Sequence, residues 1–337
     1  MKPVTIKDVA KKLNVSISSV SRAFNDKYDI KKETRERILK VANEMGYLPN
    51  PIAQKLTQKK SFNVGVVVPE FVNEYYAEVI IGIQQVLLSK GYQVLIMQSD
   101  DTSEQELKNV KTLIHNFVDG LIICPAVLSE NINFYMEEIN KGYPIVFLNR
   151  VRHDLPVNKV LFDNFKWSFF ATEHMIEQGY ERIYNLSGNN NLAITIDRVK
   201  GFKKALEKHH FPKGNYKIIE TGLLPEDGIA IVEKLIEKDD LPDAFVCVND
   251  LVALGVINYL EQKNIKVPED IGVIGFTETK MATFMHPKLS SVKQPTFEMG
   301  KSAAEILLKL INNEKVSEQT VVLNGSLNIR QSSLKQK

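Results

Sequence analysis

Residues 4–24 read VTIKDVAKKLNVSISSVSRAF and predict two short helices joined by a tight turn. Thr5 and Asp8 have the spacing of a capping box, and the apolar residues that follow recur at helical spacing. Asn14 tolerates the left-handed conformation of a tight turn, and Ser16 can accept hydrogen bonds from the free amides of a second helix. The segment therefore predicts a helix–turn–helix unit.

The second helix of this unit has one face for a core and one for solvent. Its inner face carries Val20 and Ala23, and a third helix over residues 32–45 would close the core. Small polar residues and an arginine at the start of a helix suit the major groove, where Arg bonds guanine and an aliphatic group meets a thymine methyl. The residues on this outer face are Ile17, Ser18, Ser21 and Arg22.

The charge of the chain is concentrated at its beginning. The 337 residues carry a net charge of +2, but residues 1–60 hold 14 Lys and Arg against 6 Asp and Glu, whereas residues 61–337 hold 29 against 35. A basic end on an acidic chain is suited to nucleic acid, because neutralised phosphates supply much of the affinity. A solvated basic helix would give the same charge, so charge alone leaves both readings open.

Residues 47–60, YLPNPIAQKLTQKK, predict a helical stub that begins at Pro51 behind Asn50 as its cap. A helix this short is marginal in water and needs a partner to form. Leu56 lies among basic and polar residues, and an apolar side chain on such a helix can wedge between base pairs in the minor groove. A plain flexible linker fits this stretch equally well.

Residues 4–64 resemble the DNA-binding headpiece and hinge of the lactose-repressor/galactose-repressor family of bacterial transcription regulators. The resemblance runs from VTIKDVAKKLNVSISSVSRAFN through TRERILKVANEMGYLPNPIAQKL to NVGV, with departures at Asn14, where Gly is common, and at Lys31, where Ser usually caps the third helix. It implies phosphate contacts from Thr5, Ser16 and Thr34, and base contacts from Ile17, Ser18, Ser21, Arg22 and Asn25. It implies minor-groove contacts from Ala53, Lys55 and Leu56, and further DNA contacts from Tyr47 and Asn50.

From residue 63 onward, apolar strand-like runs alternate with helical stretches. The runs cover residues 64–69, 92–98, 120–125, 144–149 and 159–163, and then residues 182–188, 217–222, 244–249 and 271–276. Such alternation predicts parallel sheets covered by helices on both sides, and two series predict two lobes. Ligands of open parallel sheets bind beyond the carboxyl ends of the strands.

This part is similar to the effector domain of the same family, which resembles periplasmic sugar-binding proteins. The similarity shows in DRVKGFKKAL, VNDLVALG, VIGFTE and HPKLSSVKQP. It implies an all-α helix-turn-helix headpiece followed by a two-lobed α/β effector domain, with parallel sheets and three crossovers. The expected boundaries are 1–48 for the headpiece, 49–61 for the hinge and 62–337 for the effector and dimerisation domain. Lobe 1 would take about 62–162 and 293–322, and lobe 2 about 163–290 and 323–334.

The resemblance also implies an effector site. It implies that Arg198 and Asn249 form hydrogen bonds with the effector. It implies that Arg150, Tyr75, Tyr76 and Gln294 complete the walls of the site. The positions at the strand ends add Asn149, Thr277 and Glu278 as candidates. Thr277 stands where the family usually has Asp, and Leu223 appears where many relatives have an aromatic ring under the sugar. Asn and Arg side chains suit a polyhydroxyl ligand. Two arginines leave a sugar acid or phosphosugar as an open alternative.

Other function classes find little support in the sequence. We find none of the GxGxxG, GxxxxGK[ST], GxSxG or HExxH motifs, so we expect no enzyme, no cofactor and no metal site. Cys124 and Cys247 lie in apolar runs, as expected of buried thiols in a reducing compartment. No apolar run is long enough to span a membrane, and the chain begins MKPVTIKDVAKKLN rather than with a basic and then apolar leader, so we expect a soluble, cytoplasmic protein.

The sequence thus predicts a transcriptional regulator, interpreted as a repressor, that binds a pseudo-palindromic operator as a homodimer. A small-molecule effector, a sugar or sugar derivative, would control its affinity by moving the lobes and so the two hinge stubs. The alternatives are a two-lobed solute-binding protein, or an effector domain for a nucleoside or anionic ligand. Effector identity, the sign of its effect and the operator sequence stay open.

Overall fold

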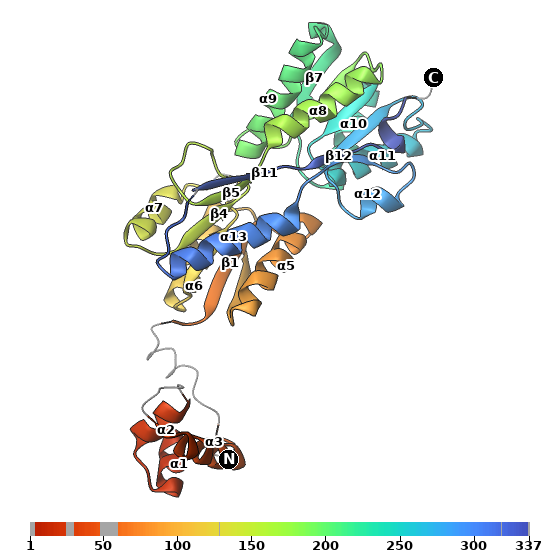
Figure 1. Cartoon of the computed structure of the whole chain (residues 1–337). Helices are drawn as coiled ribbons and strands as arrows, with labels where there is room; N and C mark the ends of the chain where they lie inside the picture. Colours follow the sequence, from red (N-terminus) through yellow and green to blue (C-terminus); the bar gives the residue numbers. More distant parts are fainter. Residues whose placement is uncertain (1–3, 25–29, 48–59, 128, 318, 336–337) are drawn as a thin grey trace. The chain divides into compact units, whose positions relative to one another are not determined.

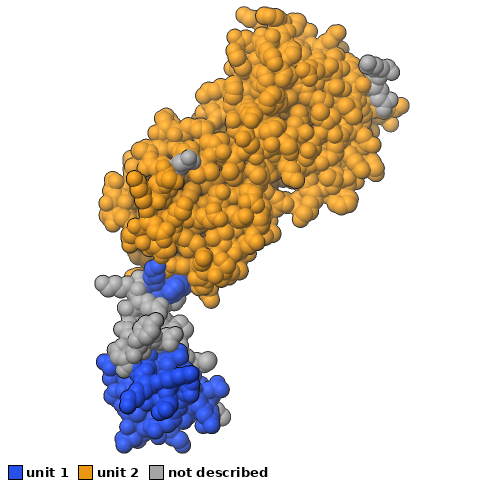
Figure 2. All heavy atoms as spheres, viewed as in Figure 1, with its two compact units in different colours: residues 1–62 blue, residues 63–337 orange. Residues whose placement is uncertain are grey.

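A computed structural model of the chain describes residues 4–24, 30–47, 60–127, 129–317 and 319–335. The contacts divide the chain into two compact units, Met1–Phe62 and Asn63–Lys337 (Figure 2).

Three helices form the first unit: α1 Ile6–Leu13, α2 Ile17–Phe24 and α3 Lys32–Glu44 (Figure 1). The predicted capping box is confirmed, because the Thr5 amide and hydroxyl both donate to Asp8 Oδ2, at 2.9 and 2.7 Å. The predicted turn is confirmed as well: Asn14 has φ 53° and ψ 46°, and the Ser19 amide donates to Ser16 Oγ at 3.0 Å. The buried core consists of Val9, Ala10, Val20, Ala23, Ile38 and Ala42.

Lobe 1 of the second unit contains a six-stranded sheet in the order β11-β5-β4-β3-β1-β2, whose paired strands all run parallel. Its strands are β1 Asn63–Val68, β2 Gln93–Gln98, β3 Gly120–Ile123, β4 Ile145–Leu148, β5 Lys159–Phe162 and β11 Thr320–Leu323. Helices α5 Glu74–Ser89 and α13 Thr296–Ile311 pack together beside this sheet. Helices α6 Ser103–His115 and α7 Ile132–Asn140 share another apolar cluster with it.

Lobe 2 has a second sheet in the order β12-β10-β9-β8-β6-β7. Its strands are β6 Ile183–Leu186, β7 Tyr216–Ile219, β8 Ala244–Cys247, β9 Gly272–Thr277, β10 Ser290–Lys293 and β12 Ser326–Asn328. The pair α8 Asn164–Glu177 and α9 Ala193–Lys208 packs on this lobe, as does the pair α10 Pro225–Glu237 and α11 Asp250–Gln262 (Figure 1). Short helical turns are α12 Met281–Phe284, η1 Lys213–Asn215 and η2 Gln331–Ser333.

The chain passes between the lobes three times: from β5 to α8, from β10 to α13, and from β11 to β12. Lys293 pairs with Thr277 in the sheet of lobe 2, and Leu323 pairs with Phe162 in the sheet of lobe 1. The sheets oppose each other at their carboxyl ends, so β12, which continues β11 straight into lobe 2, runs antiparallel to β10.

Candidate functional site

The start of α2 carries an exposed row of small side chains. Ile17 is 46% exposed, and Ser16 Oγ lies 2.7 Å from Ser18 Oγ and 2.8 Å from Ser19 Oγ. Arg22 is exposed in the last turn of the same helix. Hydroxyl groups and an arginine on one helix face can reach base edges in a major groove.

Three further residues expected at DNA lie on the same unit. Thr5 is exposed at the cap of α1, and Thr34 is half-buried in α3. The Tyr47 ring packs edge-on against Phe24, with 5.4 Å between ring centroids, and its burial raises the pKa of the phenol. The expected DNA contacts Asn25, Asn50, Ala53, Lys55 and Leu56 lie outside the described residues.

The second candidate site is the cleft between the two lobes. On one side of it the Lys280 amide donates to Glu74 Oε2 at 2.9 Å, and Lys280 Nζ lies 3.1 Å from Glu74 Oε1. On another, His153 Nε2 of lobe 1 lies 3.3 Å from Asp197 Oδ2 of lobe 2. The lobes are therefore held together in this structure by contacts that opening would break.

Arg198 is the main polar group of the lobe 2 wall. Its Nε donates to Asn164 Oδ1 at 2.8 Å, its Nη1 donates to the Val248 carbonyl, and its guanidinium lies 3.7 Å from the centre of the Phe276 ring. Burial lowers the pKa of Arg198 to about 9, and the positive Arg150 nearby acts in the same direction. Among the described residues no carboxylate forms an ion pair with this guanidinium.

Three further expected residues lie at or just after the carboxyl ends of the lobe 2 strands β8, β9 and β10. The Asn249 side chain caps α11: its Oδ1 accepts from the Val252 amide at 2.8 Å, and its Nδ2 donates to the Leu223 carbonyl at 2.9 Å. Gln294 Nε2 donates to Thr277 Oγ1 at 3.3 Å, while Gln294 Oε1 is buried without a partner in the described structure. A ligand could supply that missing donor.

Two expected effector residues are engaged by the protein itself. The Glu278 carboxylate forms an ion pair with Arg330 and accepts from Asn328 Nδ2 at 2.5 Å, so it is directed toward the last crossing of the chain. The Leu223 side chain packs against the apolar cluster of lobe 2. Contacts with an effector through these two side chains stay a prediction.

Lobe 1 contributes Tyr75, Tyr76, Asn149 and Arg150, all of which are buried. Arg150 Nη1 donates to Asp101 Oδ1 at 2.6 Å. Burial raises the pKa of both tyrosines, whose rings meet edge-on with 5.1 Å between centroids. Asn149 Oδ1 and Arg150 Nε are buried without partners in the described structure.

Sequence reasoning missed three members of this cleft: Asp101, Asn164 and Phe276. Asp101 follows β2 and Asn164 opens α8, so both stand at element ends where the strand-end rule could have found them. Phe276 is an apolar residue inside β9, and nothing in the sequence distinguishes it from core.

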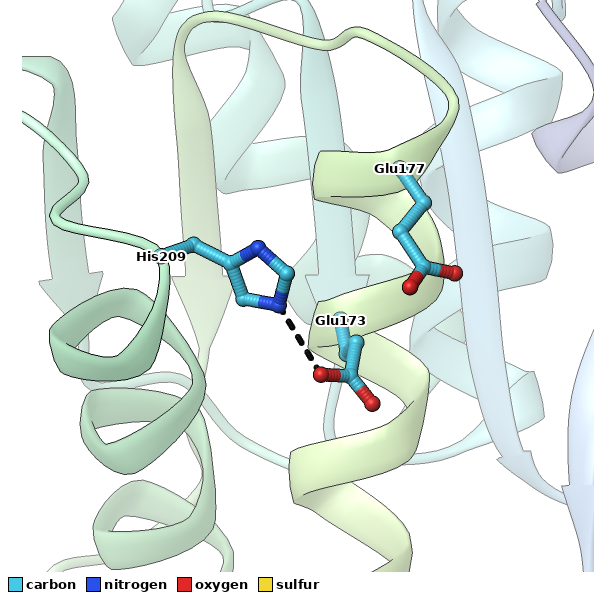
Figure 3. Close-up of side chains that lie close together, drawn as sticks. All are labelled: Glu173, Glu177 and His209. Carbon is cyan, nitrogen blue, oxygen red and sulfur yellow. Dashed lines mark hydrogen bonds and ion pairs between the residues drawn. The ribbon is translucent and has the colours of Figure 1, made fainter.

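A cluster of Glu173, Glu177 and His209 lies on α8 and at the end of α9 (Figure 3). Their potential ligand atoms lie within 4.8 Å of one another, and His209 Nε2 is 2.8 Å from Glu173 Oε1. Lys208 Nζ also reaches that oxygen, at 2.7 Å, and the hydrogen bonds from Lys208 and His209 lower the pKa of Glu173. Because an ammonium already neutralises Glu173, we interpret the cluster as an ion-pair network that ties α8 to α9.

Within the described residues, no helix combines the length and the apolar character that crossing a membrane requires.

Comparisons with known proteins match both units. Residues 5–50 match the family model "Bacterial regulatory proteins, lacI family", and residues 172–333 match the "Periplasmic binding protein-like domain". The chain is 33% identical over 332 residues to catabolite control protein A of Priestia megaterium, covering 98% of this chain and 99% of that protein. It is similar to the lac repressor dimer bound to operator and the anti-inducer ONPF, with a TM-score of 0.89 and 25% identity over 99% of this chain and 100% of that one. A CelR–cellobiose complex matches with a TM-score of 0.73 and 25% identity, over 98% and 99% of the two chains.

This chain belongs to the lacI family of bacterial regulatory proteins. It is a DNA-binding transcription regulator of the kind that binds operator DNA as a dimer and responds to small-molecule effectors.

Proposed function

We propose that this regulator is a repressor that reads a pseudo-palindromic operator through α2 and loses or gains affinity when a sugar or sugar derivative occupies the cleft. The observation that supports this most is that one chain contains both sites. The headpiece has a helix face with serines and an exposed arginine, and the cleft has buried polar atoms that lack partners in the described structure. We infer no catalytic activity. The proposed division is 1–48 headpiece, 49–61 hinge and 62–337 effector domain.

On DNA, we assign base contacts to Ile17, Ser18, Ser21, Arg22 and Asn25, and phosphate contacts to Thr5, Ser16 and Thr34. Tyr47 and Asn50 would add contacts, and Ala53, Lys55 and Leu56 would enter the minor groove at the operator centre. Exposure of Ile17 and Arg22 supports the first set. Two headpieces related by a twofold axis would then read two half-sites.

The effector would bind between the lobe walls. Polar atoms that are buried without partners in the described structure occur in both lobes and between them: Asn149 Oδ1 and Arg150 Nε in lobe 1, Thr195 Oγ1 in lobe 2, and Gln294 Oε1 on the crossing after β10. Donors and acceptors mixed in this way suit hydroxyl groups, which act as both. A sugar acid is the second candidate, because Arg198 has no carboxylate partner among the described residues.

Dimerisation would occur through lobe 1. Ile81 and Leu88 of α5 are 55% and 59% exposed, and Leu95 and Ile96 of the edge strand β2 are each 36% exposed. Apolar side chains gathered on a helix and an adjoining edge strand are typical of a surface covered by a partner. We infer that a second copy covers it, since the similar lac repressor structure is a dimer.

Selection from a random duplex library with the full-length protein tests this function. We expect a pseudo-palindromic site whose binding weakens steeply with salt. Arg22→Ala should relax the preference at one base pair of each half-site, whereas a uniform loss over all sequences would make Arg22 a phosphate contact. Leu56→Ala should weaken specific binding and leave the fold intact. Recovery of no preferred sequence would contradict the proposal.

A further inference from the structure

A cavity of about 290 Å³ opens beside Arg150, between the lobes. Lobe 1 lines it with the segment after β3, including Val127 and Ser129, and with the segment after β4, including Leu155; lobe 2 adds Ala193. The volume is close to the lower end of the range for small-molecule sites, roughly 300 Å³, so it suits a small ligand or one part of a larger one.

A buried carboxylate fixes the first wall of this cavity. Glu106 of α6 is fully buried. Its Oε2 accepts from the Ala126 amide at 2.6 Å, and its Oε1 accepts from Ser129 Oγ at 2.5 Å, Asn131 Nδ2 at 2.8 Å and Tyr135 Oη at 2.6 Å. All four donors belong to the segment after β3 or to the start of α7. A charge buried with this many hydrogen bonds holds the wall in one conformation.

A buried ammonium fixes the second wall. Lys159 of β5 is 1% exposed, and its Nζ donates to the carbonyls of Arg152, His153 and Leu155 at 3.2, 2.7 and 2.5 Å. The segment between β4 and β5 is thereby held against the start of β5. Both loops that line the cavity are therefore held by buried charges, which indicates a preformed site.

The polar groups at the cavity favour a neutral ligand. Arg150 lines it with a guanidinium; its side chain is 3% exposed and its Nη1 forms an ion pair with Asp101. Arg152, at the rim, is bound by Asp154 through both Nε and Nη2, at 2.9 and 2.6 Å. The cavity thus offers the Arg150 guanidinium as a hydrogen-bonding group without an uncompensated positive charge.

We propose that this cavity is a second compartment of the effector cleft and takes the second ring of a disaccharide. A sugar ring presents apolar C–H faces and hydroxyl edges, which match the apolar side chains of Val127, Leu155 and Ala193 and the donor of Arg150. The inference rests on the proposed function, because both rings would occupy the same cleft: one between Arg150 and Arg198, and one in the cavity.

Calorimetric titration of the full-length protein tests the compartment. The probes are glucose and galactose, the disaccharides cellobiose, maltose, lactose and trehalose, and glucose 6-phosphate. We expect at least one disaccharide to bind about tenfold or more tighter than either monosaccharide. Ala193→Phe, which fills the cavity from lobe 2, should weaken that binding at least about tenfold. Lys203→Phe adds the same ring to an exposed position further along α9 and is the matched control, which should keep the wild-type affinity.

Val127→Phe fills the cavity from lobe 1 and gives the answer if Ala193→Phe does not fold, as judged by circular dichroism. The compartment is overturned if a monosaccharide binds as tightly as every disaccharide, if only glucose 6-phosphate binds, or if none of the four disaccharides binds. It is also overturned if the folded cavity variants bind the disaccharide as the wild type does. Operator binding is measured with the same preparations. If the wild-type protein selects an operator but fails the calorimetric tests, the compartment is refuted and the proposed function stands.

Discussion

The buried arginines on the two walls of the cleft differ in their bonding partners. In lobe 1, Arg150 is paired with Asp101 at 2.6 Å, and the surrounding loops are tied down by Glu106 and Lys159. In lobe 2, Arg198 is held by the neutral groups Asn164 Oδ1 and the Val248 carbonyl, and by the face of Phe276. One wall satisfies its buried charge internally, and the other holds a desolvated charge with neutral partners.

This contrast indicates that the two lobes have different roles in effector binding. A wall whose charges are compensated keeps its shape with or without ligand, so lobe 1 can act as a preformed half-site. A guanidinium without a carboxylate keeps a desolvation cost that a bound ligand can reduce. We therefore expect lobe 2 to gain more from the effector, and effector binding to draw the lobes together.

The largest effect is expected at Glu106. Glu106→Ala removes the acceptor of four hydrogen bonds, three of them from buried residues, so the free energy of unfolding of the second unit should fall by about 3–5 kcal/mol. Urea denaturation followed by circular dichroism measures it. Glu104→Ala, at an exposed position on the same helix, is the control and should leave the midpoint unchanged. A loss below about 1 kcal/mol would mean that the lobe 1 wall does not depend on this carboxylate.

The two arginines should respond differently to the same change. Arg150→Met leaves Asp101 without its partner and should cost about 1–2 kcal/mol of stability. Arg198→Met removes a desolvated charge but also the donor to two acceptors, so we expect a net change within about 1 kcal/mol. Urea denaturation of both variants measures the two changes in the free energy of unfolding and shows which is larger. If Arg198→Met proved the more destabilising, the contrast between the walls would be refuted.

The smallest effect concerns pH and lobe 2. His174 is buried with its Nε2 2.8 Å from Ser333 Oγ, and burial lowers its pKa below 6.5. As the pH falls, His174 therefore takes up a proton at a higher pH in the unfolded chain than in the folded one. The free energy of unfolding should fall by up to about 1 kcal/mol as the pH drops below 6.5. His174→Gln should remove this part of the slope. Identical pH profiles of stability for wild type and variant would show that His174 does not contribute.

The sequence predicted those features whose signals are local. The capping box of Thr5 and Asp8 and the left-handed turn at Asn14 each depend on residues within one turn of chain. The core strands of both sheets were found because their apolar runs are continuous. Strands β10 and β12 were not recognised from pattern, because their residues mix polar with apolar; β11 was not recognised either.

The partners of the cleft residues could not be predicted. Arg150 pairs with Asp101, 49 positions away in the chain, and Glu106 gathers its donors from a different segment; no periodicity links such residues. Glu278 follows β9 as a cleft residue should, yet its carboxylate pairs with Arg330, which reaches it only through the last crossing. The DNA and effector contacts of individual residues accordingly stay predictions.

The central claim is that the separation of the lobes sets operator affinity. It is tested by changing Glu74 and Lys280, which meet across the cleft, to cysteine and joining them with a short bis-maleimide; Cys124 and Cys247 are buried. Affinity for the selected operator is then measured with and without the bridge. The account predicts a change of about tenfold or more, the scale of a coupling energy between 1 and 3 kcal/mol. Equal affinity of the bridged and unbridged proteins would contradict it.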